Sequence, residues 1–299
     1  LWRNQSTAEF VQWLRDYNTN KKLALNFYGM DLFSLTSSIT RNTELLNQYE
    51  LPLSYQLIDL YQCFSDFKQA ALSYGQQVIK NPQLSCQAQA EQQFNMISQH
   101  PDLLNNRTDN FDLYINSFMI RAAEQYFRMT FEAKAEDSWN MRERAMLAVI
   151  NSIIHHQKTK NQSAKVIIWA HNSHVGDARA TGMKQQNRES LGQLLRQQFG
   201  AQQVFLMGAL SYQGTLIASE QWGGSASLMT MPPAMEGSYS HLFHQLGLAR
   251  FIMELSTLSF QSFNQRFIGV VYDQKEEQLY HYNSAQLDQQ FDAILFIDK

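Results

Sequence analysis

Residues 166–170 have the sequence Val-Ile-Ile-Trp-Ala and lead directly into His171-Asn172-Ser173-His174, and this junction decides our prediction of the fold. A short apolar run followed by polar residues is typical of a strand buried in a parallel sheet. Polar side chains at the carboxyl end of such a strand lie in the crevice where open α/β sheets bind ligands. The stretch therefore predicts a central strand with a candidate site at its end.

Apolar runs on either side of this junction favour an α/β fold. Residues 23–28 and 204–208 predict two further buried strands. Shorter strands are expected at 215–218, 251–255, 267–272 and 293–297, with helices at 190–199 and 242–246. Strands that alternate with helices in this way predict a mostly parallel sheet flanked by helices.

The long stretch 34–160 differs from the rest, because its apolar residues recur at helical spacing with few strand signals. Helices are expected at 7–20, 37–49, 53–79, 87–99, 111–133 and 140–157. We therefore expect residues 1–33 to begin the α/β core and residues 34–160 to form a mainly helical insertion or cap subdomain. Residues 161–299 are expected to complete the core and to carry the cleft loops.

Composition excludes several classes of protein. The chain has 299 residues, of which 44% are hydrophobic and 17% charged, so it can bury a core and is not expected to be disordered. The net charge is −3 without a basic block, so we expect no nucleic-acid partner. No apolar run approaches the length of a membrane span, so no membrane partner is expected. No targeting segment is visible, and we expect a cytoplasmic protein.

The two cysteines, Cys63 and Cys86, are too few for a disulfide scaffold. A single bridge and two buried thiols both fit the sequence, so the cysteines leave the redox compartment open. Both lie in the helical stretch without an activating neighbour, which argues against a cysteine nucleophile.

His171 and His174 are the strongest candidates for chemistry. An imidazole can act as a general base, an oxyanion donor or a metal ligand near neutral pH. A lone histidine at a strand end is more often a hydrogen-bonded structural residue. Two histidines separated by only Asn172 and Ser173, at the ligand-binding edge of a sheet, favour a functional site.

Three further polar features are weaker candidates. Arg142 could clamp a carboxylate or an oxyanion, but it stands between Asn140 and Glu143, whose spacing also fits the capping box of a helix start. Asp31 follows the predicted strand 23–28 and could either orient an imidazole or serve as a turn residue. The loop 208–214 could line a pocket or could simply turn the chain.

Several familiar motifs do not occur in residues 1–299. There is no G-x-S-x-G elbow, which removes a common serine-hydrolase design. Neither a G-x-G-x-x-G nor a P-loop motif occurs, so the usual nucleotide sites are not predicted. The absence of C-x-x-C and H-E-x-x-H argues against a structural zinc site or a zincin helix.

The run from Lys165 to Gly176, followed by Asp177-Ala178-Arg179, resembles the signature of the erythromycin esterase family. Further segments are similar to that family and follow in the expected order, namely 1–4, 13–18, 27–32, 139–143, 191–196, 212–215, 232–234, 237–238, 266–270 and 291–293. The resemblance thus covers nearly the whole chain.

This resemblance implies a parallel sheet flanked by helices, a large cleft and a helical subdomain. It implies a carboxylic ester hydrolase, whose substrate in the namesakes is the lactone of macrolide antibiotics. His171 and His174 match the cleft histidines of the family, and Asn140 and Arg142 match its polar cleft wall. The family's leading Gly-Glu-x-x-His-Gly turn has no counterpart in residues 1–299. The histidine proposed to activate water is therefore expected upstream.

The leading hypothesis is water attack on a small-molecule ester or lactone, by general-base catalysis through that upstream histidine, without a covalent intermediate and without a cofactor. His171, His174 and Arg142 are predicted to be catalytic, with the positive and polar groups stabilising the oxyanion. Substrate contacts are predicted for Asp31, Trp139, Asn140 and Tyr212. Turnover of macrolides would make the protein an antibiotic-resistance enzyme.

Two alternatives remain open. His171 and His174 could supply two nitrogen ligands to a divalent metal, with a carboxylate as third ligand, in a metal-dependent hydrolase. The chain could also be a non-catalytic binding or biosynthetic accessory protein, because the expected base lies outside it.

Overall fold

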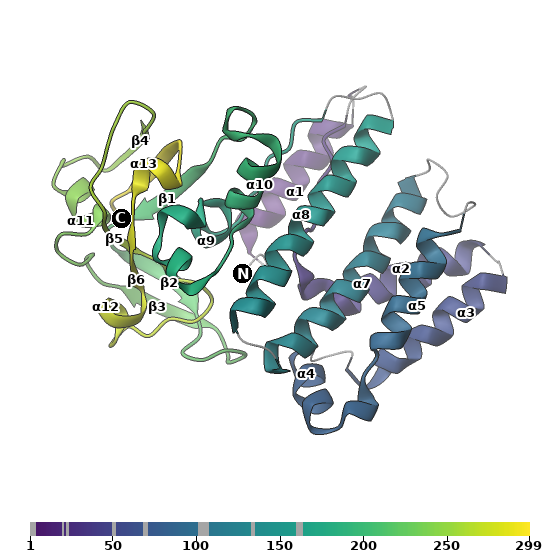
Figure 1. Cartoon of the computed structure of the whole chain (residues 1–299). Helices are drawn as coiled ribbons and strands as arrows, with labels where there is room; N and C mark the ends of the chain where they lie inside the picture. Colours follow the sequence, from purple (N-terminus) through teal and green to yellow (C-terminus); the bar gives the residue numbers. More distant parts are fainter. Residues whose placement is uncertain are drawn as a thin grey trace.

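The computed structural model describes residues 4–19, 21, 24–49, 52–67, 71–100, 108–132, 135–159 and 164–299. Long helices make up most of the first half of the chain, and short strands and helices alternate in the second half (Figure 1). The helices are α1 (Gln5–Asn18), α2 (Leu35–Tyr49), α3 (Pro52–Leu60), α4 (Ala71–Lys80), α5 (Gln87–Ser98), α7 (Thr108–Glu132), α8 (Ala135–Thr159), α9 (Asn172–Val175), α10 (Leu191–Phe199), α11 (Tyr239–His244), α12 (Glu277–Tyr280) and α13 (Leu287–Gln290). The strands are β1 (Met207–Ser211), β2 (Gly214–Ala218), β3 (Ser227–Met231), β4 (Arg250–Glu254), β5 (Phe263–Arg266), β6 (Tyr282–Ala285) and β7 (Ala293–Ile297).

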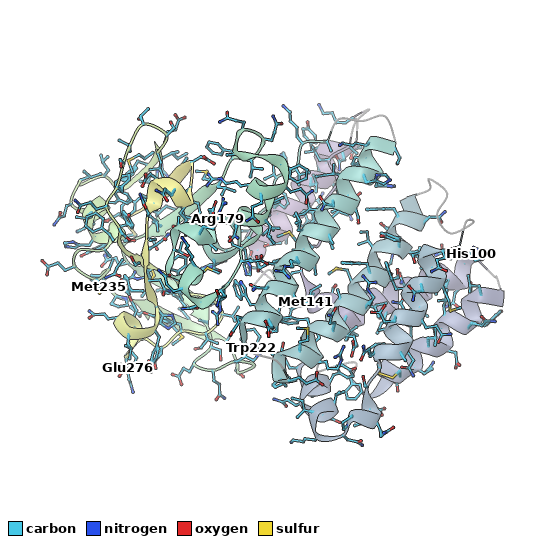
Figure 2. The ribbon with its side chains drawn as sticks, viewed as in Figure 1. His100, Met141, Arg179, Trp222, Met235 and Glu276 are labelled. Carbon is cyan, nitrogen blue, oxygen red and sulfur yellow. A yellow bond between two sulfur atoms is a disulfide. The ribbon has the colours of Figure 1, made fainter. Side chains whose placement is uncertain are left out.

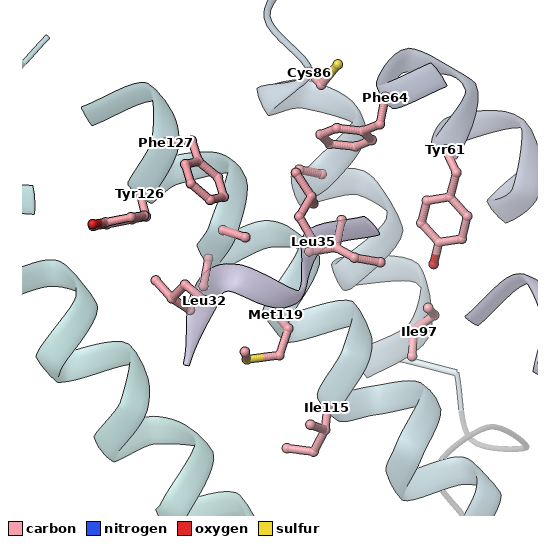
Figure 3. Close-up of a cluster of buried hydrophobic side chains, with 14 of the residues drawn as sticks. Leu32, Leu35, Tyr61, Phe64, Cys86, Ile97, Ile115, Met119, Tyr126 and Phe127 are labelled. Carbon is pink, nitrogen blue, oxygen red and sulfur yellow. The ribbon is translucent and has the colours of Figure 1, made fainter. Parts of the chain in front are cut away.

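The helical part is organised around α7, which packs against α2, α4, α5 and α8. Its apolar side chains recur at helical spacing and meet those of the neighbouring helices in one buried cluster. Figure 3 shows part of this cluster, where Tyr126 and Phe127 of α7 lie near Leu32 and Leu35. A disulfide between Cys63 and Cys86, with 5.8 Å between their Cα atoms, joins two segments of this helical part.

The sheet structure is smaller than the sequence predicts. A three-stranded sheet has the order β1-β7-β4, in which β1 and β7 are parallel and β4 is antiparallel to β7. Two antiparallel pairs, β2-β3 and β5-β6, complete the described strands. The chain is thus a helix-rich protein with small sheets, and the expected mostly parallel sheet is not confirmed. Among the expected strands, 293–297 is confirmed residue by residue as β7.

Three predicted strands are wrong in the described residues. Within the expected strand 267–272, only Val271 forms a β-bridge with another segment, an isolated one to Ser219. Residues 24–28 and 166–170 form neither helix nor strand, and residue 23 lies outside the described residues. Ile167 is 97% exposed and Trp169 is 67% exposed, although their apolar character predicts burial. A strand needs hydrogen bonds to the backbone of a neighbour, and no such bond is described for residues 24–28 or 166–170. Just beyond the second segment, the side chain of Asn172 bonds to the backbone N–H and C=O of Ala209 in β1, at 3.0 and 2.7 Å.

Helix α8 connects the helical part to the strand-containing part (Figure 1). Its buried Met146 and Ile150 pack against Leu191 and Leu195 of α10 in an apolar cluster of their own. Burial of these four side chains fixes the distance between the two helices. The polar residues one turn earlier on α8 are therefore held opposite the start of α10.

Candidate active site

The centre of the candidate site is a contact between His174 and Glu143. The Nδ1 atom of His174 lies 2.5 Å from Oε1 of Glu143. Glu143 is completely shielded from solvent, and its Oε2 accepts a hydrogen bond of 2.8 Å from the backbone N–H of Leu191. Burial raises the pKa of Glu143, whereas the contacts with His174 and the Leu191 N–H act to lower it. An imidazole that donates through Nδ1 to a carboxylate has a free lone pair on Nε2.

Helix α8 supplies two contacts of His174, Trp139 and Glu143, because residues four apart share a helix face. Arg142, three residues after Trp139, has its guanidinium carbon 5.9 Å from the centroid of the indole ring. The rings of Trp139 and His174 stack with centroids 4.9 Å apart and 9° between their planes. The indole N–H donates to the carbonyl oxygen of Glu189 at 2.7 Å, which fixes the ring. The stacked indole ring of Trp139 and the carboxylate of Glu143 together leave the imidazole of His174 little freedom to rotate.

Arg142 lies on the same face and forms a two-pronged ion pair with Asp31. Its Nε and one terminal nitrogen donate to the two carboxylate oxygens at 2.7 and 2.6 Å. Burial alone would raise the pKa of Asp31, but the hydrogen bonds and charge of Arg142 lower it, with a further contribution from His174. The carboxylate that Arg142 holds therefore belongs to the protein itself, to Asp31.

His171 has a structural role that its sequence position did not reveal. Its Nδ1 accepts a hydrogen bond of 3.2 Å from the backbone N–H of Ser173, so the imidazole caps the N-terminus of α9. The residue is exposed to solvent. Desolvation by the surrounding protein and repulsion from His174 lower the pKa of His171 to about 4, against a raising contribution from the backbone of Ile268. His171 is therefore neutral at neutral pH, with Nδ1 already engaged.

Helix α10 packs against the turn that carries both histidines. A Cβ atom at Gly192 would lie 2.1 Å from the carbonyl oxygen of Val175, so only glycine allows this close approach. The hydroxyl of Ser190, the N-cap of α10, donates to the carbonyl of Gly176 at 2.6 Å and accepts from the Ala178 N–H at 3.0 Å. These contacts fix the position of His174 relative to α8.

Two residues predicted to contact substrate, Asn140 and Tyr212, make other contacts within the protein. Asn140 is not a helix cap, because α8 begins five residues earlier with Glu136 and Asp137 in its first turn. Its amide instead donates to the carbonyl of Asn187 and accepts from the Glu189 N–H, both at 2.8 Å. Tyr212 stacks on His244 at 3.7 Å. Within the described ranges, no hydrogen bond or ring contact joins Tyr212 to His174 or Arg142.

The sequence-based site thus divides into two groups. The structure brings Asp31, Trp139, Arg142 and His174 together, and it adds Glu143, which the sequence reading had assigned to a capping box. Glu143 follows Trp139 by four residues, and this spacing, which places both side chains on one face of a helix, is the sequence signal that could have assigned Glu143 to the site.

In the part of the chain that the structure describes, no three histidine, cysteine, aspartate or glutamate side chains converge as a set of metal ligands. Among the same residues, no helix is both long and apolar enough to cross a bilayer.

Comparison with known proteins gives a consistent result. The sequence model of the erythromycin esterase family matches residues 1–299. Solved structures with a similar fold include a succinoglycan biosynthesis protein, with 17% identity and a TM-score of 0.77 over 100% of this chain and 71% of that chain. A Bacillus cereus protein has 16% identity and a TM-score of 0.80 over 100% of this chain and 72% of that one. A mutant of the erythromycin esterase EreC in its open conformation has 14% identity and a TM-score of 0.64, over 97% and 72%.

Proposed function

Because the chain belongs to the erythromycin esterase family, we propose that it hydrolyses an ester or lactone, with His174 as the general base that activates water, in place of the upstream histidine that the resemblance implies. The observation that carries this proposal is the 2.5 Å contact between His174 and the buried carboxylate of Glu143. A carboxylate bound to Nδ1 selects the tautomer whose Nε2 can remove a proton. It also stabilises the imidazolium that forms when the proton arrives.

In the proposed reaction, the Nε2 atom of His174 takes a proton from water as the water oxygen attacks the ester carbonyl. The tetrahedral oxyanion then collapses and expels the alcohol, which receives the proton from the imidazolium. No covalent bond to the protein forms at any step. Water supplies both the hydroxyl of the acid product and the proton of the alcohol product, so the reaction balances.

Arg142 is the proposed source of positive charge for the oxyanion. Its side chain is 13% exposed, and Asp31 keeps the guanidinium in a fixed orientation. A prepositioned donor of this kind typically contributes about 3–4 kcal/mol to transition-state stabilisation. His171 is proposed to act through the α9 turn that it caps, because its Nδ1 is already bonded there.

The experiment that tests this function is a hydrolysis assay with simple esters and 14-membered macrolides, in the presence and absence of a chelator. The macrolides are included because the family and one structural neighbour bear the name of an erythromycin esterase, and their turnover would add a resistance function. Ester turnover that is insensitive to the chelator supports the proposal. Turnover that the chelator abolishes favours the metal-dependent alternative, and binding without turnover favours an accessory protein.

A further inference from the structure

Two half-exposed aromatic side chains, Phe33 and Trp222, lie beside the ion pair of the candidate site. Phe33 is 48% exposed and Trp222 is 47% exposed, and their ring centroids are 6.4 Å apart. We refer to these two residues as the aromatic pair. Large aromatic side chains are costly to leave in water, and a local group of them next to polar functional residues is typical of a binding site.

The position of Phe33 follows from the short helix after Asp31. The side chain of Asp31 caps the 3-10 helix η1 (Leu32–Ser34) by accepting a hydrogen bond of 2.8 Å from the Leu32 N–H. Leu32 and Leu35 are buried in the helical core, which directs Phe33 to the surface. The guanidinium carbon of Arg142 lies 5.1 Å from the centroid of Phe33, so the aromatic pair directly adjoins the ion pair.

Trp222 reaches the same place from the loop between β2 and β3. The hydroxyl of Ser219 donates to the carbonyl of Gln221 at 2.8 Å and accepts from the Gln221 N–H at 3.3 Å, which shapes the loop. A Cβ atom at Gly223 would lie 3.5 Å from the Leu72 side chain of α4, so the loop approaches the helical part. Figure 2 shows Trp222 at this border, where the strand-containing part meets the helices.

We propose that the aromatic pair is a subsite that binds an apolar ring of the ester substrate, while Arg142 and His174 face its carbonyl group. The proposal rests on the proposed function for the orientation of the substrate. The charged groups on one side and the two ring faces on the other match an ester with a bulky apolar body. They do not match a short, fully polar ester. An aromatic face also binds a ring with less loss of entropy than it binds a flexible chain.

The test compares two methyl esters, methyl 2-naphthylacetate and methyl acetate, which share the leaving group. Trp222→Ala is expected to lower kcat/KM for the naphthyl ester about tenfold, the loss expected for one ring contact, and to leave methyl acetate unchanged, because the described contact of Trp222 is with Phe33 and not with Arg142. Trp222→Phe should keep most of the activity because it keeps a ring. Ile252→Ala is the matched control, because Ile252 is an exposed apolar residue of β4 that does not belong to the aromatic pair. Equal losses on both esters, or no loss on either, would overturn the subsite.

A binding measurement separates this proposal from the hydrolase function. The ketone 2-acetonaphthone has the same ring but cannot be hydrolysed, and calorimetry can follow its binding to the whole chain. If no ester is turned over but the ketone binds to the parent protein and about tenfold more weakly to Trp222→Ala, the function fails and the subsite stands. If the ketone does not bind, or binds all variants equally, the subsite is wrong.

A different observation carries a second inference. Both cysteines of the sequence are used in one disulfide, Cys63–Cys86, and Cys86 is fully buried. The Cys86 N–H donates to the hydroxyl of Tyr74 at 2.9 Å, and that hydroxyl donates to Glu124 of α7 at 2.7 Å. The bridge is therefore part of the packed helical core. Such structural bridges persist in oxidising compartments and are rare in the cytosol.

We infer that the bridge forms in the native protein and that the protein matures in an oxidising compartment, in contrast to the cytoplasmic location expected from the sequence. The test is to lyse the producing cells in iodoacetamide and to map the unreduced peptides by mass. A peptide pair linked through Cys63 and Cys86 supports the inference. Full alkylation of both cysteines would overturn it.

Discussion

The imidazole of His174 and the carboxylate of Glu143 lie 2.5 Å apart, and the carboxylate has no contact with solvent. Burial removes the Glu143 carboxylate from water and raises its pKa. A buried carboxylate destabilises the folded protein unless hydrogen-bond partners replace the lost contacts with water. Here the partners are His174 and the backbone N–H at the start of α10. The same carboxylate on α8 therefore both holds the start of α10 and orients the imidazole of His174.

The first prediction concerns Glu143→Gln. The amide has one acceptor oxygen in place of two, so it cannot serve both His174 and Leu191, and the imidazole loses its selected tautomer. We expect kcat for an ester to fall about 100-fold or more, with little change in KM, as is usual for loss of general-base function. Glu189→Gln is the matched control, because Glu189 pairs with Arg144, which is mostly exposed. Similar kcat values for the two variants would contradict the role of Glu143.

The second prediction concerns Arg142→Lys. Lysine keeps the positive charge but cannot form the two parallel bonds to Asp31. We expect kcat/KM to fall about 10–100-fold, through poorer placement of the charge that stabilises the oxyanion. Steady-state kinetics on methyl acetate provide the measurement. Arg144→Lys, which changes an exposed arginine on the same helix, should retain the activity of the parent, and full activity of Arg142→Lys would rule out this role.

The third prediction follows from the lowered pKa of His171. The pKa is about 4 in the folded protein and about 6.5 in the unfolded chain. Below pH 6.5 the unfolded chain binds a proton that the folded protein does not. The contribution of His171 to stability is therefore complete above pH 6.5 and is lost as the pH falls towards 4.

Two variants of His171 separate its charge from its cap. Asparagine retains a capping oxygen and does not titrate, so His171→Asn should unfold at a denaturant midpoint that depends less on pH between 6.5 and 4. His171→Ala removes the cap as well and should cost about 1 kcal/mol at pH 7. Parallel pH dependence in the parent and His171→Asn would show that His171 is not the titrating group.

The fourth prediction concerns Gly192→Ala. The added methyl group would meet the backbone of Val175, which cannot rotate away as a side chain can. We expect a loss of about 1–3 kcal/mol in stability, as for overpacked cores, together with lower activity because the His174 turn must shift. Chemical denaturation and an ester assay measure the two effects. Unchanged values for both would mean that α10 does not position the turn.

Local patterns predicted helices better than strands. The helix expected at 111–133 is α7, because its apolar periodicity depends only on neighbouring turns. The strands expected at 23–28, 166–170 and 267–272 fail in the described residues for a different reason. An apolar run indicates only that a segment favours burial. A strand also needs a neighbouring backbone within hydrogen-bonding distance, and the run does not encode that neighbour.

The candidate site was only partly visible in the sequence. His174, Arg142, Asp31 and Trp139 were identified from residue type and resemblance, and the structure brings them together. Glu143 was assigned to a helix cap, because the sequence placed the start of α8 five residues too late. The partnership of Arg142 with Asp31 joins residues 111 positions apart, and no local pattern encodes such a pairing.

The most direct test of the account is the initial rate of methyl acetate hydrolysis by His174→Asn, measured beside His241→Asn and the parent protein at pH 7. His241 accepts a hydrogen bond from the Gly237 N–H and has no described contact with Glu143 or Arg142, so it is a matched histidine outside the site. The account predicts a rate at least about 100-fold below the parent for His174→Asn and an unchanged rate for His241→Asn. Equal rates for all three proteins would contradict it.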